Sequence, residues 1–418
     1  MRTNWAGSHV YEASDLVTPT SVAEVQELVA VSPRIRALGS RHSFTDLADT
    51  PGLQVSLAGL PSTVEVVGDA VRVPAGLRYG DLATELAPRG LALANLASLP
   101  HISVAGAVAT GTHGSGRRNP SLAAAVRGLE MVSGTGELLR LSGADLAGAV
   151  VGLGALGIVT SLDLAVEPAY DLTQVVYEGL AWPALLERLE DVLGCAYSVS
   201  VFTTWVGEEV GQVWVKERTA PDSGTGAPAE PVETLLAAGA RPATEQRHMI
   251  AGMSVENTTA QLGVAGPWHE RLPHFRMGFQ PSAGEELQTE YLVPLSRAAE
   301  AVAAVRGLGE ALREVLFVTE LRTIAADDLW LSGAYGEDAL ALHFTWHREA
   351  SRVHALVERL EEVLLPLGAR PHWGKVFAAR AEALAPLYPR WDDFLDLVTS
   401  CDPQGRFRNA WTERHLGI

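Results

Sequence analysis

The sequence is poor in cysteine, in basic side chains and in long apolar runs. Its 418 residues include two cysteines, Cys195 and Cys401, which lie far apart and form no disulfide framework. A reducing, cytoplasmic setting is therefore the expectation. No stretch reaches the roughly 18 uncharged apolar residues that a membrane helix requires, and residues 1–5 lack the apolar run of a signal peptide. We expect no membrane association and no secretion.

Basic residues are outnumbered by acidic ones, 32 against 50, which gives a formal net charge of −18. A phosphate backbone needs a basic face, so this balance disfavours nucleic acid as a partner. The chain also lacks a phosphate-loop lysine motif and a Gly-x-Ser-x-Gly elbow. His269, Glu270 and His274 fail as a zinc motif because the spacing is wrong and Pro273 intervenes. Kinase, serine-hydrolase and metal chemistry are all disfavoured.

The hydrophobic content of 47% is enough for two domains with substantial cores. Up to about residue 170, short strands alternate with short helices, which predicts an α+β domain. Beyond that point longer helices and strands predict a second α+β domain, and residues 218–245, rich in Ala, Pro and Gly, read as a surface insertion. The elements expected are helices at 21–30, 81–86, 297–314 and 350–365, hairpins at 64–73 and 126–141, and strands at 158–166, 197–205, 288–293, 317–324 and 340–347.

Residues 97–116 combine small side chains, hydroxyls and glycines. Glycines such as Gly106 and Gly111 let the backbone approach a ligand closely, and hydroxyls such as those of Ser98 and Thr112 can hydrogen-bond to it. A flexible surface loop would have the same glycines. The apolar residues between them favour a packed segment that contacts a large cofactor through main-chain amides.

Residues 152–157 match a dinucleotide-type glycine pattern, but that motif must sit between a strand and a helix. Here the alternating strand 158–166 follows, so a tight turn that feeds a strand fits better.

Two predicted strands place polar groups on one face, because residues two apart in a strand point the same way. Glu320 and Arg322 share a face, and so do His343 and Thr345. This pattern fits a polar pocket or a solvated face with a cross-strand ion pair, and the pattern alone leaves both open. Lys375 is a further cationic candidate, although a lone lysine is more often on the surface.

His42 lies in a predicted glycine turn. Its imidazole either makes a local hydrogen bond or serves as a covalent attachment point for a cofactor, and the spacing does not decide between them.

Five motifs together resemble the flavin-dependent alditol oxidases (xylitol oxidase, sorbitol oxidase) of the vanillyl-alcohol-oxidase type superfamily. The motifs are residues 39–44 (GSRHSF), 97–116, 154–160, 267–276 (PWHERLPHFR) and 372–375 (HWGK).

The resemblance implies a two-domain α+β fold of the FAD-binding PCMH type, vanillyl-alcohol-oxidase-like. Residues 1–170 would form the FAD-binding domain, residues 171–370 an α+β cap domain over the flavin, and residues 371–418 a segment that returns to the FAD region. It also implies FAD bound covalently through His42.

The resemblance further implies a set of site residues. Arg322, Lys375 and His343 would be catalytic, and Ser98, Glu320, Arg322, Thr345 and Lys375 would bind substrate. Ala97 would lie where dioxygen approaches. The cofactor would contact Ala37, Leu38, Gly39, Ser40, Arg41, His42, Ser43, Ser98, Ser103, Gly106, Thr110, Gly111, Thr112, His113, Ile158 and His372.

The reaction implied is oxidation of the terminal CH–OH of an alditol such as xylitol or sorbitol to the aldose. Hydride passes to FAD, and dioxygen is reduced to hydrogen peroxide by a cytoplasmic, monomeric enzyme. The alternatives are an aldonolactone oxidase or dehydrogenase of the same superfamily, a flavin dehydrogenase that releases little peroxide, a nicotinamide-driven reductase of this fold, and a catalytically silent carbohydrate-binding protein.

Overall fold

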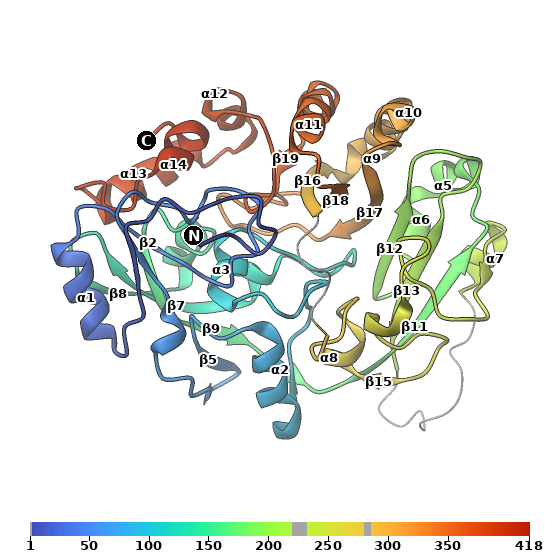
Figure 1. Cartoon of the computed structure of the whole chain (residues 1–418). Helices are drawn as coiled ribbons and strands as arrows, with labels where there is room; N and C mark the ends of the chain where they lie inside the picture. Colours follow the sequence, from blue (N-terminus) through green and yellow to red (C-terminus); the bar gives the residue numbers. More distant parts are fainter. Residues whose placement is uncertain (1, 220–231, 280–285) are drawn as a thin grey trace.

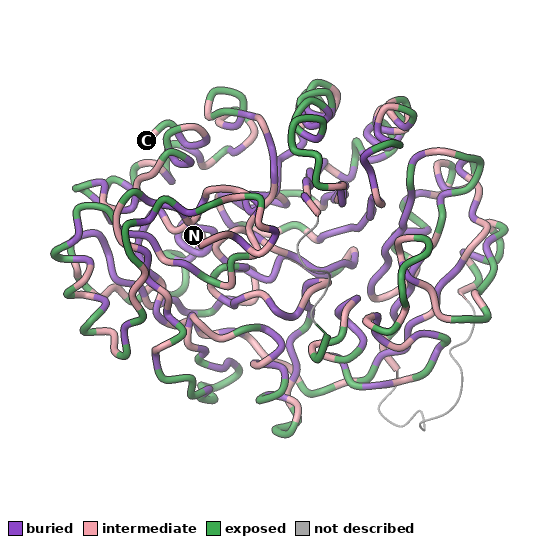
Figure 2. The backbone as a smooth tube through the Cα atoms, viewed as in Figure 1, coloured by how far each residue is buried: buried purple, intermediate pink, exposed green. Residues whose placement is uncertain are grey.

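The computed structural model describes residues 2–219, 232–279 and 286–418. The chain forms two parts that lie next to each other (Figure 1). A cavity lies between them. One part combines the N-terminal strands, in blue to cyan, with the C-terminal helices, in red. The other part is a large antiparallel sheet with helices on its outer side. The buried residues gather along the inner strands of both parts (Figure 2).

The N-terminal part contains two main sheets. A parallel three-stranded sheet has the order β1-β3-β2, and an antiparallel five-stranded sheet has the order β4-β5-β9-β7-β8. The strands are β1 (Asp15–Val17), β2 (Ile35–Ala37), β3 (Leu53–Val55), β4 (Glu65–Val67), β5 (Ala70–Pro74), β7 (Val126–Ser133), β8 (Leu138–Ser142) and β9 (Gly157–Ala165), with β6 (Leu91–Ala92) paired to β10 (Glu167–Pro168). The helices are α1 (Val22–Val31), α2 (Tyr79–Leu86), α3 (Val104–Ala109) and α4 (Leu146–Ala149).

Local sequence signals explain where these elements begin and turn. Helix α1 begins after Ser21, whose hydroxyl accepts a hydrogen bond from the backbone N–H of Glu24 at 3.2 Å. Val25 and Val29, four residues apart, bury the same face of the helix. The β4–β5 hairpin turns at Gly68, whose φ of 65° is a conformation that glycine adopts at no steric cost.

The second part is one sheet in the order β14-β11-β13-β12-β17-β18-β16-β19, with β15 paired to β11. Its strands are β11 (Asp171–Glu178), β12 (Ser198–Thr203), β13 (Gln212–Arg218), β14 (Arg241–Pro242), β15 (Gly266–Pro267), β16 (Glu286–Pro294), β17 (Leu316–Ile324), β18 (Ala339–His347) and β19 (Arg370–Pro371). Its helices are α5 (Trp182–Glu187), α6 (Leu189–Leu193), α7 (Glu233–Ala237), α8 (Trp268–Arg271), α9 (Ala298–Gly307), α10 (Gly309–Leu312) and α11 (Ala350–Leu364).

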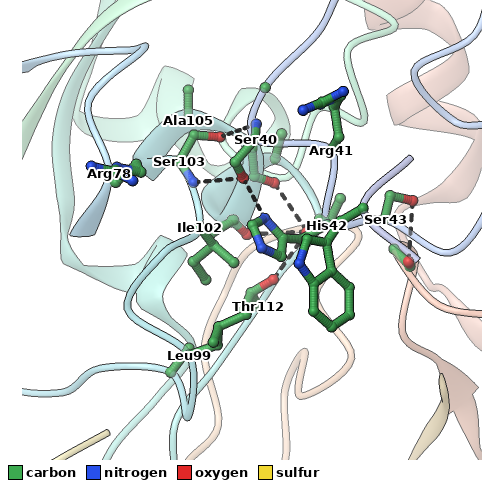
Figure 3. Close-up of a pocket in the computed structure, with 18 of the residues that line it drawn as sticks. Ser40, Arg41, His42, Ser43, Arg78, Leu99, Ile102, Ser103, Ala105 and Thr112 are labelled. Atoms are coloured by element: carbon green, nitrogen blue, oxygen red, sulfur yellow. Dashed lines mark hydrogen bonds between the residues drawn. The ribbon is translucent and has the colours of Figure 1, made fainter. Parts of the chain in front are cut away.

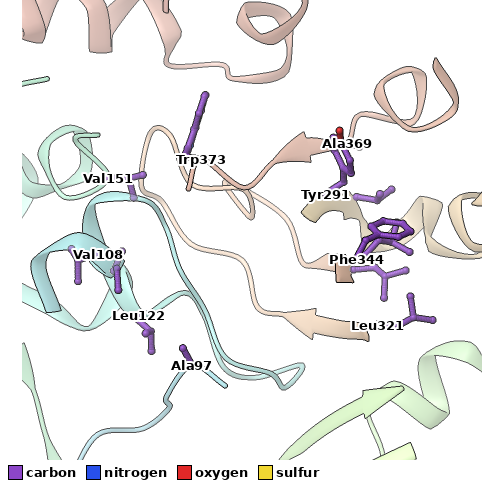
Figure 4. Close-up of a cluster of buried hydrophobic side chains, with 14 of the residues drawn as sticks. Ala97, Val108, Leu122, Val151, Tyr291, Leu321, Phe344, Ala369 and Trp373 are labelled. Carbon is purple, nitrogen blue, oxygen red and sulfur yellow. The ribbon is translucent and has the colours of Figure 1, made fainter. Parts of the chain in front are cut away.

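The central strands of this sheet alternate between an apolar and a polar face. Tyr291, Leu321 and Phe344 are fully buried on the apolar face, where α9 and α11 pack (Figures 1 and 4). Burial of each such side chain contributes about 1.5–3 kcal/mol. With the apolar face covered by helices, the polar residues of the same strands face the other way, toward the cavity.

The C-terminal segment packs back onto the N-terminal part. It contains α12 (Ala381–Leu384), α13 (Trp391–Cys401) and α14 (Ala410–Leu416). The buried Arg36 guanidinium donates to the carbonyls of Gly154 (2.9 Å) and Phe407 (2.8 Å), and the Asn409 amide donates to the carbonyl of Asp49 at 2.7 Å. These contacts join strand β2, the glycine turn before β9 and the C-terminal segment.

Two sequence expectations need correction. The helix expected over 297–314 is broken at Leu308 into α9 and α10, because the flanking glycines Gly307 and Gly309 are poor helix formers. The expected surface insertion at 218–245 lies partly outside the described residues. Its remainder contains α7 and β14, and Leu235 of α7 is fully buried against the core.

No helix among residues 2–219, 232–279 and 286–418 has the length and apolarity needed to cross a membrane.

Candidate active site

A cavity of about 950 Å³ lies between the N-terminal part and the large sheet. Its walls come from residues within the segments 36–44, 97–113 and 149–159 on one side and within β16, β17, β18 and the segment 372–375 on the other. This volume is at the upper end for small-molecule sites, so the cavity has room for a large cofactor.

On the N-terminal wall, two loops are locked together by paired serines (Figure 3). The Ser40 hydroxyl accepts from the backbone N–H of Ser103 at 3.0 Å, and the Ser103 hydroxyl accepts from the backbone N–H of Ser40 at 3.3 Å. A Cβ added at Gly39 or at Gly106 would come within 2.5 and 2.7 Å of the Ser103 hydroxyl oxygen, so a larger residue at either position would displace this hydroxyl from its hydrogen bond. The wall therefore presents bare backbone to the cavity.

His42 extends from this wall beside the cavity (Figure 3). Its Nδ1 lies 3.0 Å from the Ser40 hydroxyl oxygen, and its ring stacks on Trp5 with a centroid separation of 5.4 Å. Burial, together with the nearby His101 and Arg41, lowers the pKa of His42 to about 4. The imidazole is therefore neutral at neutral pH.

The His42 loop is also tied to the loop that carries Lys375. The backbone N–H of Phe44 and the hydroxyl of Ser43 both donate to the Gly374 carbonyl, at 2.8 and 3.1 Å. Two motifs more than 300 positions apart in the sequence thus meet at one wall of the cavity.

On the opposite wall, strand register aligns three ionisable residues in one row. His343 on β18 lies opposite Glu290 on β16 and opposite Glu320 on β17. The next row on the same face carries Thr345 opposite Gln288. All five of these side chains line the cavity.

Glu290 is the centre of a buried charge cluster. Its carboxylate accepts from the Arg322 guanidinium and from Lys375 Nζ, both at 2.6 Å, and lies 3.3 Å from His113 Nε2. Burial alone would raise the pKa of Glu290, but the charges of Lys375 and Arg322 prevail and hold it well below its usual range. Burial lowers the pKa of Lys375, and Glu290 opposes that shift. The carboxylate therefore favours the charged forms of both basic groups and holds them beside the cavity.

Glu320 is held in a second cluster. Its Oε1 lies 2.8 Å from His274 Nε2, while its Oε2 lies 3.5 Å from His343 Nδ1 and 3.6 Å from Arg322 Nε. Burial would raise the pKa of Glu320, yet Arg322 and His274 keep it well below its ordinary value. Burial, reinforced by Lys375, lowers the pKa of His343 to about 4. The pair at neutral pH is an ionised carboxylate beside a neutral imidazole.

Most of the residues expected from sequence meet in this one cavity. Gly111 and Ile158 do not line it: Gly111 takes a left-handed turn with φ 65°, and Ile158 is buried in a core cluster with Val25 and Val29. Because side chains alternate along β9, Val159 faces the cavity instead. The expected residues that do line it are Ala37, Leu38, Gly39, Ser40, Arg41, His42, Ser43, Ala97, Ser98, Ser103, Gly106, Thr110, Thr112, His113, Glu320, Arg322, His343, Thr345, His372 and Lys375.

The polar side of the cavity, called the polar wall below, is formed by His274, Gln288, Glu290, Glu320, Arg322, His343, Thr345 and Lys375. Three of these residues were not expected from the sequence, namely Gln288, Glu290 and His274. The positions of Gln288 and Glu290 could have been predicted. They lie two residues apart in an expected strand and therefore share a face. His274 lies in the motif 267–276, but the only chemical role considered for it was that of a metal ligand. Its proximity to Glu320 arises from tertiary packing between a loop and β17, for which the sequence carries no local signal.

The N-terminal wall suits the FAD implied by the sequence resemblance. Closely packed glycine loops expose main-chain groups, hydroxyls line the cavity at Ser103, Thr110 and Thr112, and a neutral imidazole lies at the wall. The polar wall faces the same cavity, so an alcohol bound there would lie beside the cofactor.

Comparison with known proteins agrees with this arrangement. The family model of the FAD binding domain matches residues 13–142, and that of D-arabinono-1,4-lactone oxidase matches residues 284–415. The crystal structure of cholesterol oxidase from B. sterolicum is similar in fold, with a TM-score of 0.77 at 15% identity, covering 99% of this chain and 96% of that one. The chain thus has the FAD-binding PCMH-type fold of the vanillyl-alcohol-oxidase superfamily, and it is an FAD-dependent oxidoreductase.

Sequence relatives place the chain within that class. It is 45% identical over 416 residues to an alditol oxidase of Streptomyces sp. (strain IKD472), a match that covers 98% of this chain and 97% of the relative. An L-gulono-1,4-lactone dehydrogenase of Mycobacterium tuberculosis is 29% identical and covers 99% of this chain, with 98% of the relative matched. The chain belongs to the alditol oxidase family.

Proposed function

We propose that this protein oxidises the terminal CH–OH of alditols such as xylitol and sorbitol to the aldose, with release of hydrogen peroxide. The observation that carries the proposal is the charge balance of the polar wall, where Glu290 and Glu320 lie against Arg322 and Lys375. The two carboxylates offset the two cations, so the wall offers many hydrogen-bonding groups with little net charge. Such a surface suits an uncharged ligand with several hydroxyls.

When bound, FAD accepts two electrons from an alcohol and passes them to dioxygen, which yields hydrogen peroxide. The substrate hydroxyl must lose its proton as its carbon is oxidised. The neutral imidazole of His343 accepts that proton, and Arg322 and Lys375 stabilise the negative charge that develops on the oxygen. Glu320, Thr345 and Ser98 hold the remaining hydroxyls by hydrogen bonds.

The cofactor is held by the glycine and hydroxyl loops of the N-terminal wall and linked covalently to His42. Support comes from the position of His42 at the cavity wall and its neutral imidazole. Ala97, a small residue in the same cavity, lies on the path by which dioxygen approaches. Acid precipitation of the purified protein tests the link: yellow retained in the pellet supports it, and yellow that stays with the His42→Ala pellet moves the attachment point elsewhere.

An aldonolactone oxidase is the second candidate, because the D-arabinono-1,4-lactone oxidase model matches the region that contains the polar wall. Initial rates of peroxide release with xylitol, sorbitol and L-gulono-1,4-lactone separate the two. Higher kcat/KM for the alditols supports the proposal, and a higher value for the lactone replaces it with the second candidate. Flavin reduction without peroxide would instead indicate a dehydrogenase.

The proposal also includes a monomer in a reducing, cytoplasmic compartment. The compartment is supported by the two cysteines, Cys195 and Cys401, which are both unbridged. The domain boundaries proposed are 1–170, 171–370 and 371–418, because strands before and after about residue 170 belong to different sheets. Size-exclusion chromatography with light scattering tests the monomer.

A further inference from the structure

Only two lysines occur in the chain: Lys216, which is buried, and Lys375, whose side chain is 13% exposed. Lys375 belongs to the polar wall, but Lys216, on β13, has a side chain that is 1% exposed and does not line the cavity. Among the described residues no carboxylate forms an ion pair with Lys216. A buried amine is costly unless its donors are satisfied, so its contacts indicate why this lysine is here.

Lys216 Nζ has three acceptors around it. It donates to the Leu272 carbonyl, to the Pro273 carbonyl at 3.3 Å and to His274 Nδ1 at 3.2 Å. An ammonium has three N–H donors and no lone pair, so these three acceptors match it fully. The contact with His274 requires that Nδ1 present its lone pair, which places the ring proton of a neutral imidazole on Nε2.

His274 Nε2 lies 2.8 Å from Glu320 Oε1. With its proton on Nε2, the ring donates to the carboxylate and fixes that oxygen. The other carboxylate oxygen, Glu320 Oε2, then faces His343 and the cavity. In the other tautomer a nitrogen lone pair would face the ionised carboxylate and repel it. The proton between Lys216 Nζ and His274 Nδ1 could also lie on Nδ1. In that case Nε2 still carries its own proton and still donates to Glu320.

We infer that Lys216 is a positioning residue for substrate binding, which acts by holding His274 as the donor that orients the Glu320 carboxylate. The inference rests on the proposed function, in which Glu320 accepts hydrogen bonds from substrate hydroxyls. Loss of this orientation weakens substrate binding more than the oxidation step. The expected signature is therefore a rise in KM with a smaller change in kcat.

Two variants of His274 test this hydrogen-bonded chain, Lys216–His274–Glu320, with the lysine unchanged. The Nε2 of a glutamine can take the place of His274 Nε2 as a donor to Glu320, whereas an asparagine is too short to reach. We expect His274→Gln to raise the KM for xylitol less than threefold and His274→Asn to raise it about tenfold. Equal KM values for the two variants would overturn the inference.

The coupling between the two residues provides the second test. We expect Lys216→Met to raise KM about tenfold in the otherwise native holoenzyme, but less than threefold when combined with His274→Gln, because the amide donates without help from the lysine. A tenfold rise in both backgrounds would show a packing role only and would overturn the inference. Flavin absorbance per protein provides the check that each variant is folded and loaded.

KM values of the same variants with L-gulono-1,4-lactone distinguish a failure of the proposed substrate class from a failure of the positioning role of Lys216. If the native enzyme prefers the lactone, the proposed substrate class fails, and the variants are then compared on the lactone. A KM difference between His274→Gln and His274→Asn would still support the role of Lys216 and His274 in orienting Glu320. Equal KM values for the two variants on both substrates would overturn that role.

Discussion

Replacement of Glu290 by glutamine should weaken both the fold and the catalytic site. The carboxylate accepts from Arg322 through one oxygen and from Lys375 through the other, each at 2.6 Å, with almost no exposure to solvent. An amide of the same shape keeps one acceptor and turns an NH₂ group toward the second cation. Removal of one partner from a buried ion pair costs about 3–5 kcal/mol.

This loss can be converted into a melting temperature. Unfolding entropy is about 2.1 cal/mol/K per residue, so a loss of about 4 kcal/mol lowers Tm by about 5 °C in a chain of 418 residues. Differential scanning calorimetry of the FAD-loaded protein measures the shift.

The same change alters the pH dependence of catalysis. Glu290 raises the pKa of Lys375 against the effect of burial, so its removal lets that pKa fall further. If the ammonium stabilises the developing alkoxide, activity is present below this pKa and is lost above it. The alkaline limb of the kcat/KM profile in Glu290→Gln therefore moves to lower pH, and kcat/KM at neutral pH falls about 10²–10³-fold.

Glu361→Gln is the matched control. Glu361 is also a buried glutamate, but Tyr291 Oη (2.8 Å) and the backbone N–H of Ala378 (2.7 Å) both donate to its Oε1. An amide oxygen accepts both bonds, so we expect a Tm change below about 1 °C and native activity. If Glu290→Gln behaves like this control in Tm and in pH profile, the electrostatic role assigned to Glu290 is wrong.

The further predictions concern three residues of the polar wall: Lys375, His343 and Thr345. Lys375→Met should lower kcat by about 10²–10³-fold with the flavin spectrum retained, and unchanged turnover in peroxide assays would refute its role. His343→Gln should lower kcat by about 10²–10⁴-fold. In the native enzyme kcat/KM should fall as the pH drops through about 4, where His343 becomes protonated, and an acid limb near the ordinary histidine pKa would contradict that assignment. Thr345→Val should raise the KM for xylitol about three- to tenfold at nearly constant kcat, and a fall in kcat alone would show that Thr345 does not bind substrate.

The features that depend on local sequence patterns could be predicted from the sequence. Period-two alternation placed Glu320 with Arg322 and His343 with Thr345, and the register of β17 and β18 then joined the two pairs on one face. Between a polar pocket and a solvated sheet face, the structure decides for the pocket, since the cavity covers this face.

Contacts that depend on tertiary packing could not be predicted from the sequence. The Lys216–His274–Glu320 chain joins a strand, a loop and a second strand that are 58 and 46 residues apart in sequence, and no local pattern pairs them. Ile158 shows a different limit. An alternating strand fixes which residues share a face but not which face meets the ligand, so a shift of one residue exchanges Ile158 for Val159.

Anaerobic mixing of the flavin-loaded enzyme with xylitol tests most directly whether the polar wall binds an alditol for oxidation by the adjacent cofactor. We expect the visible flavin absorbance to bleach with xylitol and to return when air is admitted, with one hydrogen peroxide released per cycle. L-Gulono-1,4-lactone should bleach it more slowly. Rapid bleaching by the lactone with none by xylitol or sorbitol would contradict the account.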